Sequence, residues 1–160
     1  MRIATLMGAT ISMGLVAGVF GLYAHTIMPG LARTDDRTFV GAFQSIDRAI
    51  INPWFLGGGF FGALVLTILA AVAHIGRDGL PWVATALALY AITFVITIAI
   101  NVPLNDAIKA AGDPDRIDLT AVRERFDEVR WASWNIVRVI TSTTAFGLLA
   151  WALTLPGRPS

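Results

Sequence analysis

The stretch LPWVATALALYAITFVITIAINVPLN, residues 80–105, contains no charged residue and decides the fold class. It exceeds the roughly 20 apolar residues that a helix needs to cross a bilayer. Three further runs, residues 3–24, 49–73 and 131–157, are as apolar, and only Arg138 interrupts the last one. We therefore predict an all-α integral membrane protein built as a four-helix bundle. The predicted spans are residues 5–29, 51–74, 80–105 and 131–155.

The composition of the chain supports this class. Of 160 residues, 56% are hydrophobic and 14% are charged, whereas a soluble domain has roughly 25% charged residues. The first apolar run continues beyond the 7–15 residues typical of a signal-peptide core, so we expect it to remain as a span. Residues 1–160 then form one transmembrane domain surrounded by membrane lipid. The net charge of +1 predicts no nucleic-acid partner, and the lack of cysteine excludes disulfides and cysteine nucleophiles.

The connections between the predicted spans are unequal in length. The turn HIGRDGLP joins the second and third spans, whereas the first and third loops are long enough to hold helices. Apolar residues recur in both loops at spacings of three and four, which predicts amphipathic interfacial helices at residues 35–49 and 118–130. Thr34 is a candidate N-cap for the first. The apolar positions are Phe39, Phe43, Ile46 and Ile50 in the first helix and Leu119, Val122, Phe126 and Val129 in the second.

With four spans, both long loops emerge at the same end of the bundle, which we call the large-loop end. Eight Lys and Arg residues lie in these loops against three at the other end. The positive-inside rule then predicts that the large-loop end faces the cytoplasm, with the protein in the cell membrane. Ten acidic residues share the same loops and offset this charge.

Polar residues from all four predicted spans gather near the large-loop end. An intramembrane charge is costly and generally faces a protein interior or a watery cavity, so Arg138 is a candidate functional residue. Two readings of Arg138 stay open: a role in a site, or a structural role in which it snorkels or pairs with an acid of the loops. The polar residues concerned are His25, Asn52, Asn101, Asn105, Asn135 and Arg138. The candidate acidic partners are Asp47, Asp106 and Asp127.

His25 is a candidate general base, because a histidine can accept a proton at neutral pH. It could equally be an interfacial residue at a helix end. A haem held by two histidines is disfavoured, because His25 and His74 lie at opposite faces, about 30 Å apart. A metal ion would need His25 with Asp47 or Asp106, and no ligand motif supports such a set. We expect no metal site and no cofactor.

Four motifs resemble one known family. They are YAHTIMPGL at residues 23–31, FQSID at 43–47, NVPLN at 101–105 and RWASWNIVR at 130–138. Together they resemble a family long catalogued as a domain of unknown function, which includes the fungal anthrone oxygenases. The resemblance extends from about residue 8 to residue 150. It implies a four-helix membrane protein and, by analogy with the characterised relatives, oxidation of an anthrone to an anthraquinone by dioxygen.

The chemistry that this resemblance implies can be matched to residues of the chain. An anthrone has an acidic C–H between two aromatic rings, and its enolate can reduce dioxygen without metal or flavin. The protein would supply a base, hydrogen-bond donors for the enolate oxygen and aromatic walls. His25 would be the base, and Arg138 with Asn101, Asn105 or Asn135 would be the donors. The aromatic walls would be Tyr23, Phe43, Trp131 and Trp134.

Two functions therefore stay open. The chain is either an oxygenase that acts on a hydrophobic aromatic small molecule, or a non-catalytic membrane subunit that binds lipid or another small molecule. In the second case Arg138 and the asparagines would be structural hydrogen-bond partners within the bundle. A homo-oligomer is compatible with both. In either case Pro103 is expected to open the last turn of the third span, because proline lacks the amide proton and clashes with residue 99.

Overall fold

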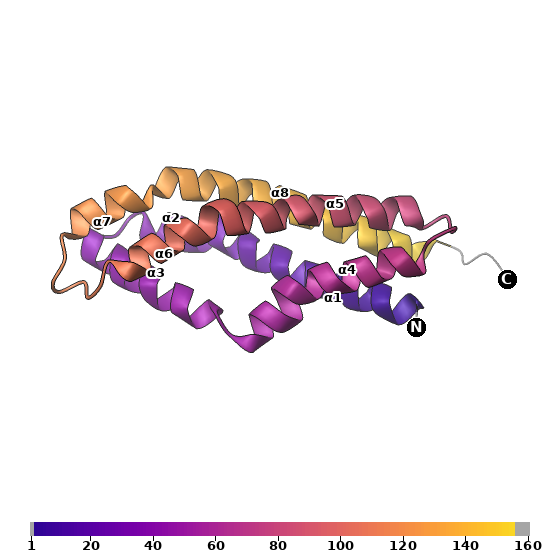
Figure 1. Cartoon of the computed structure of the whole chain (residues 1–160). Coiled ribbons are helices and arrows are strands. Elements are labelled where there is room, and N and C mark those ends of the chain that lie inside the picture. The colour runs from indigo at the N-terminus through magenta and orange to yellow at the C-terminus, as the bar shows by residue number, and fades with distance from the viewer. Residues whose placement is uncertain (1, 156–160) are drawn as a thin grey trace.

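The structure is a computed structural model that describes residues 2–155, and these residues contain no β-strand. Four long helices run alongside one another in an elongated bundle (Figure 1). Three of them contain a segment of the wider π-helix, marked η. The segments of the four long helices are α1 (Arg2–Leu22), η1 (Tyr23–Ile27) and α2 (Met28–Leu31); η2 (Trp54–Phe61) and α4 (Gly62–Ala73); α5 (Leu80–Ile96), η3 (Thr97–Asn101) and α6 (Val102–Ala110); and α8 (Glu128–Thr154).

All four helices are long and apolar enough to cross a membrane, which confirms the predicted fold class. Large apolar side chains such as Leu15, Val65, Val95 and Ile140 are exposed on their outer faces. These faces suit a lipid environment, because lipid requires no burial of apolar side chains. The chain is an integral membrane protein.

The helices of the two long loops cover one end of the bundle. α3 (Asp36–Ile50) and α7 (Leu119–Phe126) lie there with α2 and α6, while the α4–α5 turn lies at the opposite end (Figure 1). Phe39 and Phe43 of α3 are fully buried and pack against Phe126 of α7, with ring centroids 5.7 and 4.6 Å away. The amphipathic faces therefore pack on each other as a cap on the bundle.

The ends of the loop helices differ from the sequence expectation. Asp35, rather than Thr34, is the N-cap of α3, and its carboxylate accepts the Thr38 amide at 2.9 Å. α7 ends at Phe126 because Asp127 adopts a left-handed conformation and caps α8. Val129 consequently belongs to α8, where its side chain is 78% exposed.

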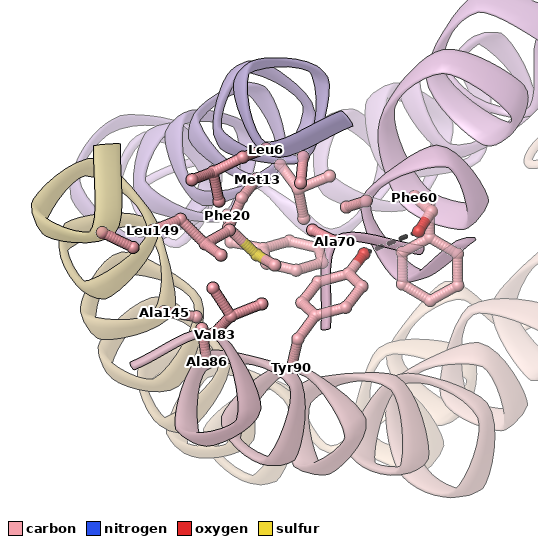
Figure 2. Close-up of a cluster of buried hydrophobic side chains, with 14 of the residues drawn as sticks. Leu6, Met13, Phe20, Phe60, Ala70, Val83, Ala86, Tyr90, Ala145 and Leu149 are labelled. Carbon is pink, nitrogen blue, oxygen red and sulfur yellow. Dashed lines mark hydrogen bonds between the residues drawn. The ribbon is translucent and has the colours of Figure 1, made fainter. Parts of the chain in front are cut away.

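A hydrophobic core fills the half of the bundle away from the cap. Small residues of α5 and α8, such as Ala86 and Ala145, pack against larger side chains of α1 such as Met13 (Figure 2). The Tyr90 hydroxyl of α5 donates to the Phe60 carbonyl of η2 at 2.8 Å (Figure 2). The Phe60 carbonyl lies in a π-turn. In a regular α-helix this carbonyl would instead accept a hydrogen bond from an amide of the same helix.

Prolines explain two of the π-helical segments. Pro29 and Pro103 both lack an amide proton and would clash with a carbonyl in the preceding turn. The amides just before them, of Met28 and Val102, bond five residues back, to the carbonyls of Tyr23 and Thr97. The turn before Pro103 is therefore widened, as expected, but the third long helix continues through it to Ala110.

Candidate functional site

A cavity of about 190 Å³ lies where the three π-helical segments meet the cap. Each π-segment contributes to its wall: Tyr23 from η1, Phe55 and Phe60 from η2, and Thr97 from η3. π-turns inside α-helices are frequent at functional sites, because they re-aim side chains and leave backbone groups outside the regular ladder. The complete lining is Val19, Phe20, Tyr23, Asp47, Ile50, Ile51, Phe55, Leu56, Phe60, Phe61, Thr97, Ile98, Val102, Asn105, Asp106, Lys109, Trp131 and Arg138.

The cavity has an apolar side at the outer surface of the bundle and a polar side near the cap. Ile51, Phe61 and Ile98 line it and are each about half exposed on the outer surface of the bundle, at 54, 47 and 50%. Asp106 and Lys109 line the other side near the cap, and the Asp106 side chain is 62% exposed. A small apolar molecule could therefore enter from the bilayer, while polar groups reach the site from the cap.

Arg138 borders the cavity as a buried cation with no ion-pair partner. Its side chain is 4% exposed, and no carboxylate of residues 2–155 lies within ion-pair distance. The guanidinium donates to neutral groups only, through Nη2 to Asn135 Oδ1 at 2.8 Å and through Nη1 to Thr97 Oγ1 at 3.4 Å. Its Nε has no hydrogen-bond partner. Arg138 therefore places an uncompensated charge beside this cavity, together with a buried donor that has no partner.

Two aromatic rings hold the Arg138 guanidinium in place. Its central carbon lies 4.3 Å from the ring centroid of Phe20 and 5.3 Å from that of Trp131. A cation over an aromatic face is attracted by the ring quadrupole, more strongly where water is excluded. These contacts offset part of the cost of burying the charge without supplying an anion.

A second hydrogen-bond chain links the cap to the cavity wall. The Trp131 indole Nε1–H donates to Asn105 Oδ1 at 2.6 Å, and Asn105 Nδ2 donates to Asp47 Oδ1 at 2.6 Å. Lys109 Nζ lies 2.8 Å from Asp47 Oδ2 and 3.0 Å from Asp106 Oδ1. Oδ2 pairs with the Lys109 ammonium and has no other donor, so this oxygen keeps a lone pair.

The three candidate asparagines are buried or partly buried, but they do different things. Asn135 donates to the Phe20 carbonyl at 3.1 Å and accepts from Arg138, so it positions the guanidinium. Asn105 belongs to the chain just described. Asn101 donates to the Trp131 carbonyl at 3.2 Å and leaves its Oδ1 unpartnered. No hydrogen bond joins Asn101 or Asn105 to Arg138 within the described chain.

The remaining candidates separate into cavity and non-cavity residues. Tyr23 and Trp131 line the cavity, with ring centroids 5.6 Å apart. Phe43 lies behind Trp131, against which it packs edge-on at 5.8 Å, and does not line the cavity. Trp134 is 37% exposed and lies outside it. His25 is also exposed outside the cavity, where its Nδ1 is hydrogen bonded to Thr26 Oγ1 at 2.6 Å.

The positions of the acids bear on metal binding. His25 is absent from the cavity that Asp47 and Asp106 line. Residues 2–155 contain no cluster of three His, Asp or Glu side chains that could hold a metal ion. The ligand set considered from the sequence is therefore not assembled in this structure.

Lys109 and Thr97 lie in the cavity but were not among the sequence candidates, and Asp47 was considered only as a partner of Arg138 or as a metal ligand. Asp47 is the last residue of the FQSID motif and is 4% exposed. Thr97, Asn101, Asn105 and Lys109 recur every four residues along one side of the third long helix. This stripe, together with the motif, was the signal that could have identified them.

The fold and the cavity define a class: a small four-helix membrane protein with a lipid-accessible aromatic cavity that ends at a buried cation. A sequence profile of the anthrone oxygenase family matches residues 52–148, more than half of the chain, and the chain belongs to this family. No curated protein and no solved structure matches the chain.

Proposed function

We propose that the protein is an oxidoreductase of the membrane that oxidises a flat aromatic ketone of the anthrone kind with dioxygen. One observation carries the proposal: the unpaired Arg138 guanidinium, with its free Nε, borders an aromatic cavity in a member of the anthrone oxygenase family. A buried cation without a counter-ion is costly unless an anion joins it. The enolate oxygen of the ketone would be that anion.

The cavity dimensions and walls support a flat apolar substrate. Its volume of about 190 Å³ exceeds the roughly 150 Å³ of an engineered apolar cavity that holds benzene. Phe20, Tyr23, Phe55, Phe60 and Trp131 surround the space with rings. A fused-ring ketone dissolved in the bilayer would enter past Phe61 and Ile98 and place its oxygen at Arg138.

The proposed reaction balances without a further reactant. Loss of a proton from the acidic CH₂ gives an enolate, which transfers an electron to dioxygen. The radical pair combines to a peroxide at the same carbon. Loss of the second C–H proton with cleavage of the O–O bond then gives a carbonyl and water, so that one ketone and one O₂ yield one quinone and one H₂O. Arg138 and its neighbours would stabilise the enolate oxygen, an electrostatic contribution that is often the largest in such reactions.

The non-catalytic alternative requires the polar cluster to satisfy itself. Asn105 and Trp131 do so. Arg138 Nε and Asn101 Oδ1 do not, and an unpaired buried donor supports a ligand at this place. If the protein is non-catalytic, we therefore expect it to bind the aromatic molecule without oxidising it.

The experiment uses the purified full chain in detergent with anthrone under air. We expect quinone absorbance to rise faster than in detergent alone, with one O₂ consumed per quinone. Under ¹⁸O₂ one labelled oxygen should enter the quinone. Saturable anthrone binding without acceleration would favour the non-catalytic alternative, and neither binding nor acceleration would overturn the proposed substrate class.

We also propose that the large-loop end faces the cytoplasm from the cell membrane. The support is the excess of Lys and Arg in the first and third loops, eight against three at the other end.

A further inference from the structure

We infer that Asp47 is the catalytic base that removes the substrate proton. This inference rests on the proposed function and names a residue for its first step. Asp47 lines the cavity from α3 and is 4% exposed, so a buried acid forms part of the wall that a bound molecule would contact. His25, the base suggested by the sequence, is exposed and does not line the cavity.

The hydrogen bonds of Asp47 leave it able to accept a proton. Oδ1 accepts one hydrogen bond, from Asn105 Nδ2, while Oδ2 pairs with Lys109 and has no other donor. A carboxylate has about four lone-pair positions, so at least one remains for a C–H proton. Asn105 and Lys109 would hold the carboxylate in one orientation, as a positioned base requires.

The charges of the cavity are arranged for this transfer. Four charged side chains line it: Asp47 with Lys109 and Asp106 near the cap, and Arg138 without a counter-ion. In the transfer the substrate C–H bond breaks, the proton goes to Asp47, and the electron pair moves to the substrate oxygen. The negative charge thus leaves the carboxylate beside Lys109 and appears beside Arg138, and the net charge of the cavity does not change.

This arrangement reduces the electrostatic cost of forming an enolate in an apolar space. Before the transfer the negative charge is on the Asp47 carboxylate beside Lys109. After the transfer it is on the enolate oxygen beside Arg138. Both cations are fixed in the resting structure, one by two carboxylates and the other by Asn135 and two rings. Donors that are fixed before the reaction require no reorganisation when the charge develops.

The test measures the proton step without dioxygen. Purified full-length protein is incubated with anthrone in anaerobic D₂O, and deuterium entering the CH₂ group is followed by mass spectrometry. Wild type should accelerate the exchange, and Asp47→Asn should slow it by at least about 100-fold, the lower range of general-base contributions. Asp115→Asn is the matched control, because Asp115 pairs with Arg37 at the surface, away from the cavity.

Folding is controlled by a charge-balanced variant. Asp47→Asn leaves Lys109 without its buried partner, so Asp47→Asn/Lys109→Met is measured beside it, with gel filtration and thermal melting of each. Both folded variants should bind anthrone and fail to exchange it. Acetate should partly restore exchange in Asp47→Ala, which a purely structural role would not allow.

The outcomes separate the two proposals. If the Asp47 variants still exchange deuterium, Asp47 is not the base. The same holds if His25→Ala loses the exchange while the Asp47 variants retain it. Either result leaves an active oxygenase. Loss of the fold in every Asp47 variant with no acetate rescue makes Asp47 structural and overturns the inference too. Wild-type protein that neither exchanges nor oxidises anthrone overturns the proposed function itself.

Discussion

Trp131 and Trp134 show how one residue type separates into two roles. The sequence places both on one helical face with Asn135 and Arg138. In α8 the buried positions include 131, 135, 138 and 142, so Trp134 lies at the edge of that face and is 37% exposed. The periodicity predicts which side of a helix faces inward, but not which residue at its edge contacts lipid.

We expect Trp131→Phe to impair the protein and Trp134→Phe to have little effect. Trp131→Phe keeps a ring on the cavity but removes the donor to Asn105, which leaves a partly buried amide oxygen unpaired at a cost of about 1–3 kcal/mol. Trp134→Phe should change stability by no more than about 0.5 kcal/mol. Thermal melting and anthrone turnover of both variants check this, and equal effects would contradict the assigned contacts.

The asparagines and acids show the limit of prediction at this scale. The motifs correctly located Asn101, Asn105, Asn135 and Arg138 at one end of the bundle. The pairing of Asn105 with Asp47 joins residues 58 positions apart, and its geometry depends on how α3 folds over α6. Such a contact follows from tertiary packing and has no signature in local spacing.

At the scale of elements, the π-helical segments position the cavity walls. Pro103 just after η3 made the widened turn there predictable, whereas no proline follows η2, which was not predicted. Gly14 with Gly18 and Gly58 with Gly62 have the GxxxG spacing that favours close packing of membrane helices. The first and second spans do pack together, and a Cβ on Gly62 would lie 3.7 Å from Ser12 Oγ of α1. A Cβ on Gly14 would meet Phe146 of α8 at 3.0 Å, and one on Gly18 or Gly58 would meet nothing within 4 Å.

Gly62 at the end of η2 is expected to be sensitive to substitution. A Cβ there would lie 2.6 Å from the Gly57 carbonyl oxygen, so Gly62→Ala must displace the π-turn that supplies Phe55 and Phe60 to the cavity. We expect a loss of about 1–3 kcal/mol and reduced turnover. Gly58→Ala is the matched control and should be neutral or slightly stabilising. Equal melting temperatures would show that η2 tolerates the added methyl group.

The link between α3 and α7 is expected to depend on pH. Thr120 donates to Asp36 at 2.8 Å and Arg123 donates to it at 3.0 Å, and these contacts hold the pKa of Asp36 below its usual value. A lowered pKa in the folded state stabilises the fold above the unfolded pKa, near 3.9, and this contribution is lost as the pH falls through the folded value.

The measurement compares melting temperatures of wild type and Asp36→Asn between about pH 7 and pH 3. The variant should be less stable at pH 7, and the difference should shrink below about pH 4 as Asp36 protonates. Glu124→Gln, at an exposed acid of α7 that forms no ion pair within residues 2–155, is the control. A difference that stays constant with pH would rule out the Asp36 contacts as its cause.

For the whole molecule, the sequence predicted the four helices and the cap at one end, because long apolar runs and amphipathic spacing are local signals. The cavity was not predictable as a volume, since it results from the packing of η2 against α1 and of α3 over the open end. Its polar end faces the cap and its apolar rim faces lipid, so the same bundle can take an apolar molecule from the bilayer and place it beside charges.

The proposed orientation predicts which end a membrane-impermeant thiol reagent reaches. The chain has no cysteine, so single variants are uniquely labelled. Arg116→Cys, at an exposed site in the third loop, should react only after cells are opened, whereas Arg77→Cys in the α4–α5 turn should react in intact cells. The reverse pattern would invert the proposed topology.

The most direct test of the account is a paired measurement of turnover and thermal melting in Arg138→Met, with Arg116→Met as the control. If Arg138 stabilises the enolate oxygen, quinone formation should fall by about 10²- to 10³-fold in Arg138→Met. The melting temperature should stay within a few degrees, because the variant removes an unpaired buried charge at the cost of its bond to Asn135. Unchanged turnover, or loss of turnover only in proportion to loss of the folded protein, would contradict the account.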